Sequence, residues 1–326
     1  MSRASSLRVV TFVLLLGAVI IFFSGFSPNF ATTANLAAML RHMSATELSA
    51  LGLTFVVVVR KSDLAFPGIA SFGAMTVGWL VAQENNLVVA LVAGIGIGVI
   101  FGAISGAAVG FLRLPDIVST IAIGSISLSL SYIYSSGATI SDNFMSAGMT
   151  DINDHRVAFL DAPVFVMLVV NVVAWLILHR SRFGQGFYAT GENPRSAVFS
   201  GIRIRMYLLG AFAVSAGMSC LAGILRCAEA GQADVSAGGG LLMPAYASVY
   251  LGAALFGRAS VLATFASSLL ISATLNGSTV LNVPYYYGDG MIGAILLIAI
   301  TVFDPRTGRL FSAAMFRSGY RANVEL

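Results

Sequence analysis

The residues best suited to chemistry in this sequence are polar side chains set inside long apolar stretches. Such side chains cost free energy in a lipid bilayer unless they face other protein or a water-filled path. Their hydroxyl and amide groups also exchange hydrogen bonds with an uncharged polar solute. They therefore line a pathway for such a solute or bond one helix to another, and both interpretations stay open. The candidates for the pathway, spaced four residues apart along helix faces, are Tyr246 and Tyr250, and Ser268, Ser272 and Asn276.

The sequence contains no pattern typical of a catalytic, nucleotide or metal site. Its only lysine, Lys61, follows Val-Val-Arg and lacks the glycines of a phosphate-binding loop. The histidines, His42, His155 and His179, are isolated from one another and from carboxylates at ligand spacing. Asp and Glu fall almost wholly in loops, which counts against an ion relay. The chain is predicted to be no enzyme, with no ATPase site and no cofactor or metal of its own.

The composition is typical of a membrane protein. The 326 residues are 57% hydrophobic and 10% charged, with a mean hydropathy of +0.88, whereas soluble domains carry about 25% charged residues. The net charge of +4 is spread too thinly to form a phosphate-binding face, so nucleic acid is not an expected partner. Residues 1–326 are predicted to form a single membrane domain embedded in the lipid bilayer.

Apolar runs between charged or turn residues predict about ten membrane helices. The first run follows Arg8 and lacks a signal-cleavage site, so it is interpreted as an uncleaved span. The predicted fold class is therefore an all-α polytopic membrane protein. The expected spans are residues 8–26, 45–59, 66–82, 87–112, 116–135, 162–178, 206–226, 241–257, 259–278 and 288–303.

Basic residues predict the orientation of these spans, because Lys and Arg are retained on the cytoplasmic side. With the N-terminus inside, only Arg41, Arg156 and Arg226 of the 18 basic residues fall outside. Both termini are thus expected in the cytoplasm, with residues 304–326 as a tail. The acidic residues expected outside are Glu47, Glu84, Asp142, Asp151, Asp154, Asp161, Glu229, Asp234 and Asp289.

Small residues mark one helix face for close packing. A glycine at every fourth position leaves that face almost without side chains, so another helix can approach it. Cys220 and Cys227 lie seven residues apart, about 10 Å along a helix, which is too far for a disulfide. They are interpreted as packing thiols. The glycines predicted to pack against another helix are Gly94, Gly98, Gly102, Gly106 and Gly110.

The inside segment 179–205 is the most charged part of the chain. It reads HRSRFGQGFYATGENPRSAVFSGIRIR. Asn193 suits the cap and Pro194 the first turn of a short helix over 194–200. Such a helix between two spans suits docking against a cytoplasmic partner, and an ordinary connecting helix is the alternative.

Residues 181–194, SRFGQGFYATGENP, continue to Ser200-Gly201-Ile202. They resemble the cytoplasmic coupling region in permease subunits of bacterial ABC importers for monosaccharides, of the ribose, xylose and autoinducer-2 type. Residues 106–122 and 292–304 extend this resemblance, which covers roughly residues 40–305. Segment 60–68, RKSDLAFPG, departs from the family's Gly-Gly-Ile-Asp-Leu-Ser-Val-Gly but keeps Asp63, Leu64 and Gly68.

The resemblance implies a permease subunit in the bacterial inner membrane that passes a sugar from a periplasmic solute-binding protein to the cytoplasm. It also implies two ATP-binding cassette subunits, which bind ATP and Mg, and a second permease copy or paralogue. Five helices in each half permit an inverted repeat. The residues implied in coupling to the ATPase are Glu192, Asn193, Pro194, Arg195, Ser200 and Gly201.

Three alternatives remain open at this point. A related ABC permease for branched-chain amino acids or nucleosides would share this architecture. A stand-alone secondary carrier would work without an ATPase, and a membrane scaffold would carry no solute. The sequence names neither the sugar nor the second permease.

Overall fold

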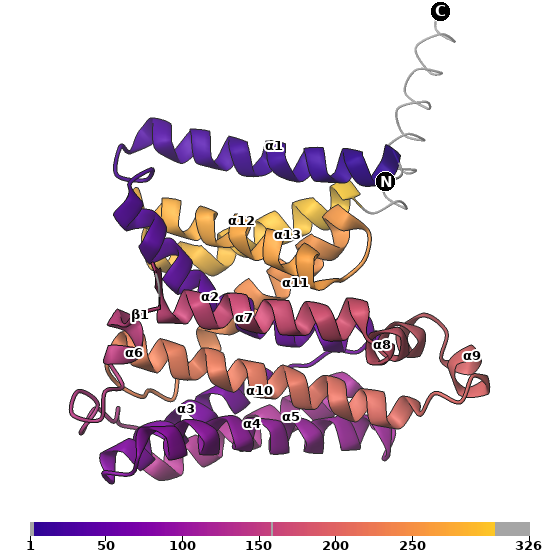
Figure 1. Ribbon diagram of the computed structural model, residues 1–326, viewed down its shortest axis with the longest axis horizontal. Helices are drawn as coiled ribbons and strands as arrows, with labels where there is room; N and C mark the ends of the chain where they lie inside the picture. Colours follow the sequence, from indigo (N-terminus) through magenta and orange to yellow (C-terminus); the bar gives the residue numbers. More distant parts are fainter. Residues whose placement is uncertain (1–2, 158, 304–326) are drawn as a thin grey trace, which may run out of the picture.

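The computed structural model describes residues 3–157 and 159–303, and helices make up most of them (Figure 1). The long helices are α1 (Arg3–Phe26), α2 (Thr33–Val58), α3 (Phe66–Ala82), α4 (Leu87–Gly110), α5 (Asp116–Ser135), α7 (Ala162–Trp175), α10 (Ile204–Ala230), α11 (Leu242–Phe256), α12 (Val261–Val280) and α13 (Gly288–Phe303). The short helices are α6 (Asp151–Asp154), η1 (Leu176–Arg180), α8 (Arg182–Glu192), α9 (Pro194–Phe199), η2 (Gly239–Leu241) and η3 (Tyr285–Tyr287). Strands β1 (Arg156–Val157) and β2 (Leu160–Asp161) pair antiparallel.

Each of the ten predicted ranges coincides with or overlaps one long helix. Among the described residues, seven helices are long and apolar enough to cross a membrane, and two shorter apolar helices cover Phe66–Ala82 and Tyr285–Ala299. The chain is therefore a multi-pass membrane protein. The number of crossings, the side of each terminus and the inverted repeat stay predictions, and the expected tail 304–326 lies outside the described residues.

Loop side chains determine where several helices begin. The Oγ1 of Thr32 accepts a hydrogen bond from the Asn35 backbone N at 3.3 Å at the start of α2. The Oγ of Ser260 accepts one from the Ala263 backbone N, also at 3.3 Å, at the start of α12. These bonds satisfy N–H groups that have no partner within the first turn of a helix. The turn residues of the sequence thus fix these helix boundaries.

Helix α2 lies in the middle of the bundle. The helices run side by side in Figure 1, and α2 contacts α7, α10, α11 and α12. Helix α10 also packs against α3 and α4, while α1 lies at one edge against α11 and α12. The main hydrophobic core includes Phe55 of α2, Phe66 of α3 and Phe212 of α10. Side chains on α2 are therefore enclosed by protein on several sides.

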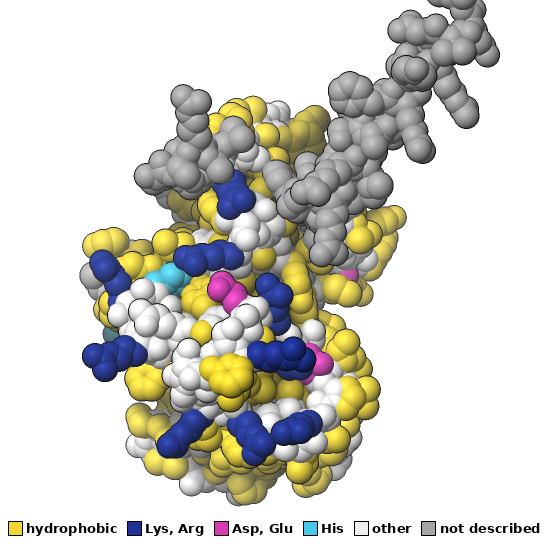
Figure 2. Space-filling view, turned by 90° about the vertical axis from the view of Figure 1, so that its right-hand side faces the viewer, with side chains coloured by type: hydrophobic (Ala, Val, Ile, Leu, Met, Phe, Trp, Pro, Cys, Tyr) yellow, Lys and Arg dark blue, Asp and Glu magenta, His cyan; other side chains and the backbone are white. Residues whose placement is uncertain are grey.

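The two ends of the bundle differ in charge. We call one of them the basic end: it holds segments 59–65, 111–115, 176–205 and 257–260, and α8 and α9 project from it (Figure 1). Figure 2, which faces this end, shows Lys and Arg side chains spread over it and few Asp or Glu side chains. The opposite end holds segments 136–161 and 231–241. A β-bridge between Ile140 and Ala233 connects these two segments.

The row of glycines on α4 faces its neighbouring helices. A Cβ at Gly98 would lie 2.5 Å from the Cys220 Sγ of α10, and one at Gly102 would lie 2.7 Å from the Ala216 Cβ. Only glycine permits so close an approach without a shift of the helices. The remaining members of the row, Gly94, Gly106 and Gly110, also face α3 or α10. Both cysteines are free and buried, as predicted, and Cys220 packs against this row at Gly98.

Glu47 lies inside the bundle, so its expected position outside is wrong. Its side chain is 0% exposed. Because α2 begins at Thr33 and not near residue 45, Glu47 is about four turns into the helix. The predicted span was set to begin where the apolar run begins, at residue 45. Helix α2 begins earlier, at its Thr32 cap, and therefore carries Glu47 into the bundle.

Candidate functional site

Helix α9 is a short exposed helix at the basic end. The Asn193 Oδ1 accepts a hydrogen bond from the Ser196 backbone N at 3.1 Å, and Pro194 occupies the first turn. The helix ends before Gly201, whose φ of +79° is a left-handed conformation that favours glycine. The predicted short helix with its Asn193 cap is thus confirmed. The residues implied in coupling are all exposed: Glu192, Asn193, Pro194, Arg195, Ser200 and Gly201.

Two apolar side chains of α9 project from this charged end. Phe199 is 93% exposed and Val198 is 59% exposed. Val198 also lines a cavity of about 680 Å³, together with Gly110, Phe111, Arg113 and residues 202–206. Large exposed apolar groups beside a hollow favour contact with another protein. Sequence reasoning missed Phe199, although an apolar pair within a charged inside segment was a usable signal.

Helix α8 connects α9 to the membrane helices. The Tyr188 Oη donates a hydrogen bond to the Ala259 O, in the turn between α11 and α12, at 3.0 Å. The Arg258 guanidinium lies over the Tyr188 ring, 5.2 Å from its centroid. Gly191 packs directly against the backbone of Val58 at the end of α2. Helix α8 thus contacts both the end of α2 and the turn between α11 and α12.

The predicted tyrosine pair lies at the turn between α2 and α3. Tyr246 and Tyr250 of α11 are stacked, with ring centroids 5.8 Å apart and an interplanar angle of 7°. The Tyr246 Oη donates a hydrogen bond to the backbone O of Asp63 at 2.8 Å. The Asp116 Oδ2, at the start of α5, accepts one from the Ser62 backbone N at 2.8 Å. The turn between α2 and α3 is thus hydrogen-bonded to both α11 and α5.

Asp63 anchors this turn to α10. Its Oδ2 accepts a hydrogen bond from the Ser215 Oγ at 2.8 Å, and its Oδ1 accepts one from the Ala65 backbone N at 2.9 Å. Burial raises the pKa of Asp63 to about 6 because a low-dielectric surrounding disfavours the charged form, while these hydrogen bonds act in the opposite direction. In the sequence, Asp63 was notable only as a position retained from the resembling family.

A cavity of about 420 Å³ lies at the opposite end, between α2, α10, α11, α12 and α13. This volume is within the range of about 300–1,000 Å³ that is usual for small-molecule sites. Ser272 and Asn276 of α12 line it, together with His42, Arg226 and Glu229. The cavity thus combines neutral polar groups with ionisable ones.

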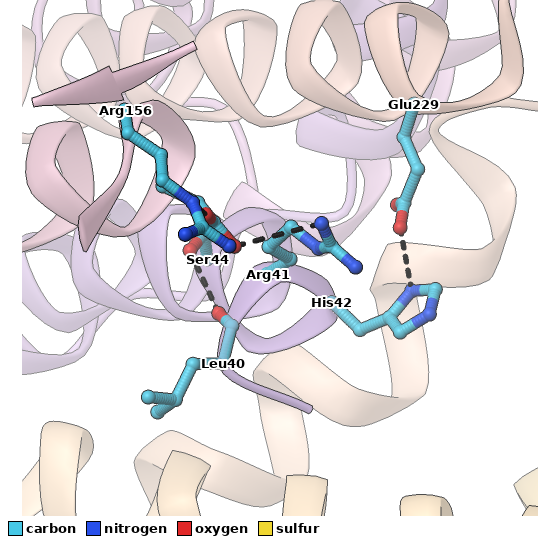
Figure 3. Close-up of polar contacts among 7 residues, drawn as sticks. Leu40, Arg41, His42, Ser44, Arg156 and Glu229 are labelled. Atoms are coloured by element: carbon cyan, nitrogen blue, oxygen red, sulfur yellow. Dashed lines mark hydrogen bonds and ion pairs between the residues drawn. The ribbon is translucent and has the colours of Figure 1, made fainter. Parts of the chain in front are cut away.

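A charged contact forms one wall of this cavity. In Figure 3, His42 of α2 and Glu229 of α10 point toward each other, with His42 Nδ1 3.1 Å from Glu229 Oε1. Nearby, Asp161 Oδ2 lies 3.5 Å from Arg41 Nη1, and Asp161 Oδ1 lies 3.3 Å from Arg156 Nε. These contacts join α2, α10 and the β-hairpin.

The predicted pathway residues do not gather into one site. The tyrosines lie at the basic end, whereas Ser272 and Asn276 line the cavity at the opposite end. Asn276 also exchanges two side-chain hydrogen bonds with Asn35 of α2, of 2.7 and 3.0 Å, so it joins two helices. Ser268 is buried and does not line this cavity. A role for these residues along a solute path stays a prediction.

A bundle of long apolar helices with the short exposed helix α9 at its basic end defines a multi-pass membrane protein. The description "Branched-chain amino acid transport system / permease component" belongs to the family that matches residues 35–300, and this chain belongs to that family.

Curated relatives of the chain include several sugar-import permeases. The ribose import permease protein RbsC of Escherichia coli (strain K12) is 27% identical over 289 residues, which cover 87% of this chain and 89% of that protein. The D-allose transport system permease protein AlsC of the same organism is 27% identical over 298 residues, covering 88% and 89%. The autoinducer 2 import system permease protein LsrC of Salmonella typhi is 26% identical over 310 residues, covering 92% and 86%. The predicted family resemblance is confirmed.

Proposed function

We propose that this chain is the transmembrane permease subunit of an ATP-driven ABC importer, passing a sugar from a periplasmic binding protein to the cytoplasm. Its family membership supports a permease role. Relatives named for ribose, D-allose and autoinducer 2 favour a sugar over an amino acid or a nucleoside. The protein would lie in the bacterial inner membrane, with its basic end in the cytoplasm.

The observation that carries this proposal is the exposed α9 at the basic end. A helix that presents Phe199 to solvent on a charged surface suits a protein partner. The partner would be an ATP-binding cassette subunit, which supplies the ATP and Mg site and performs hydrolysis. A second permease copy or paralogue would complete the assembly, since a pair of ATP-binding subunits needs two docking helices.

Solute transport would then follow from movement of α9. Nucleotide-driven closure of the ATP-binding subunits would displace α9 and α8. The contacts of Gly191 with α2 and of Tyr188 with Ala259 would pass this displacement into the bundle. Because Tyr246 holds the turn at Asp63, the basic end would open or close as α11 moves. The solute would move between the two ends without chemical change.

The test combines co-purification with transport. Full-length tagged protein in mild detergent should recover an ATP-binding subunit, and the reconstituted assembly should take up a labelled sugar only with ATP. Arg195→Glu and Gly201→Trp should weaken both ATPase stimulation and uptake. If both variants keep full stimulation and uptake, the coupling assignment is wrong.

The alternatives give different outcomes in the same system. A panel of labelled ribose, allose, leucine and a nucleoside separates the sugar permease from its amino-acid and nucleoside counterparts. Uptake that an ionophore abolishes but that ATP depletion leaves intact would indicate a secondary carrier. Absence of flux with every recovered partner would indicate a scaffold.

A further inference from the structure

Helix α2 carries a buried carboxyl group that the proposed transport cycle does not use. Glu47 is 0% exposed and lies in the middle of α2. Asn171 of α7 and Ser268 of α12 lie beside its carboxyl group. Three helices that are distant in sequence therefore meet at this side chain.

Glu47 forms no ion pair with any residue in the described part of the chain. Neither α7 nor α12 contains a Lys, Arg or His, and α11 contributes only tyrosines as ionisable groups. The nearest basic groups on α2, Arg41 and His42, are paired with Asp161 and Glu229. On α10, Arg205 lies near the start of the helix and Arg226 near its end. A negative charge at Glu47 would thus be buried without a counter-charge, which is strongly unfavourable.

The buried oxygen atoms around Glu47 lack one hydrogen-bond donor. The Asn171 Nδ2 donates a hydrogen bond to the Met167 O at 3.0 Å, which orients the amide. The Asn171 Oδ1 has no donor. That Oδ1, both oxygens of Glu47 and the Ser268 Oγ are buried without a hydrogen-bond partner. With an ionised carboxylate, the only donors are the Ser268 hydroxyl and the second Nδ2–H of Asn171, and the Asn171 Oδ1 is left without a donor when both serve the carboxylate. With a neutral carboxyl group, Glu47 can donate to Asn171 while Ser268 donates to the other Glu47 oxygen, and all four atoms are satisfied.

We propose that Glu47 is a proton-binding site, occupied at neutral pH, and that its proton completes a hydrogen-bonded connection between α2, α7 and α12. The same α2–α12 seam contains two further polar contacts, Thr54 with Thr264 at 2.7 Å and Asn35 with Asn276. Glu47 adds α7 to this seam. Because α7 continues through η1 into α8, the site fixes the helix that leads to the coupling region.

Isotope-edited infrared spectroscopy tests this proposal on the full chain. Cell-free synthesis with glutamate carrying ¹³C in its side-chain carboxyl labels Glu47, Glu84, Glu192, Glu229 and Glu325. Of the four in the described part of the chain, only Glu47 is buried. In lipid nanodiscs at pH 7, the labelled protein should show a band of a protonated carboxyl group. Glu47→Gln should remove this band, and the exposed control Glu84→Gln should retain it. A wild-type spectrum containing only ionised labelled carboxylates at pH 7 overturns the proposal.

Thermal unfolding provides a second readout that does not depend on the spectrum. Glutamine offers the same donor to Asn171 and the same acceptor to Ser268 as a neutral glutamic acid. Glu47→Gln should therefore unfold at the wild-type midpoint, whereas Glu47→Ala should unfold lower by about 2 °C or more, since it leaves Asn171 without a donor. A fall for Glu47→Gln equal to that for Glu47→Ala contradicts the proposed hydrogen bonds.

Discussion

Replacing Gly102 with alanine should force α4 and α10 apart. The new Cβ would lie 2.7 Å from the Ala216 Cβ and 2.8 Å from the Ala213 Cα, and nearer still to the Phe212 carbonyl oxygen. Carbon atoms in favourable contact are about 3.5–4.0 Å apart, so the two helices must separate by roughly 1 Å. Gly96 provides a matched control on the same helix, because a Cβ at that position would meet no atom of a neighbouring element within 4 Å.

The two substitutions share every effect except this packing. Both remove a glycine from the interior of α4, which favours the helix by up to about 1 kcal/mol. Overpacking costs about 1–3 kcal/mol, and only Gly102→Ala incurs it. We therefore expect Gly102→Ala to be about 1–3 kcal/mol less stable than Gly96→Ala. For a chain of this size the midpoint of thermal unfolding changes by roughly 1–2 °C per kcal/mol.

Circular dichroism of both variants and wild type in identical nanodiscs measures this difference. Gly96→Ala should unfold at or above the wild-type midpoint, and Gly102→Ala below it. Equal midpoints for the two variants would refute the reasoning, because they would show that α4 and α10 do not need a bare surface at Gly102.

Three further predictions concern the two ends of the bundle. Folding raises the pKa of Asp63 from 3.8 to about 6, so the folded state favours the protonated form. The free energy of unfolding should therefore fall by up to about 3 kcal/mol as the pH rises from 4 through 6. Asp63→Asn should lose this pH dependence when the free energy of unfolding is measured by denaturation. Phe199→Ala should weaken binding of the ATP-binding subunit about tenfold or more in a nanodisc binding assay, whereas Phe183→Ala, an exposed phenylalanine on α8, should not; equal affinities for the two variants would contradict docking through Phe199. Asn276→Leu should lower stability by about 1–3 kcal/mol because Asn35 loses its partner, and adding Asn35→Leu should restore part of it; strictly additive losses in this double-mutant cycle would argue against the contact.

The helices of this protein follow from its sequence to a large degree. Apolar runs located all ten long helices, because the bilayer and the helix core impose the same length and composition on each. Asn193 and Pro194 located α9, since capping and first-turn chemistry are local. The glycine spacing on α4 likewise predicted a close helix contact. Each of these features depends on neighbours within a few residues, which the linear sequence contains.

The candidate site was less accessible to sequence reasoning. Four-residue spacing placed Ser268, Ser272 and Asn276 on one face of α12, but it could not show that Ser268 faces a buried carboxyl group while Asn276 pairs with Asn35. Periodicity gives the face of a helix and not the element that covers it. Phe199 was missed for a related reason: its exposure depends on how far α9 projects from the bundle.

The sequence by itself determined that this chain is a helical membrane protein, approximately where its ten long helices lie, and which permease family it resembles. Hydropathy, capping and residue spacing are local properties, and they suffice for these conclusions. The tertiary structure decided which polar groups meet: Asp63 with Ser215 and Tyr246, His42 with Glu229, and Glu47 with Asn171 and Ser268. The partners in these contacts come from helices far apart in the chain, and only the packing of the bundle sets the distances and the burial that give them their chemistry.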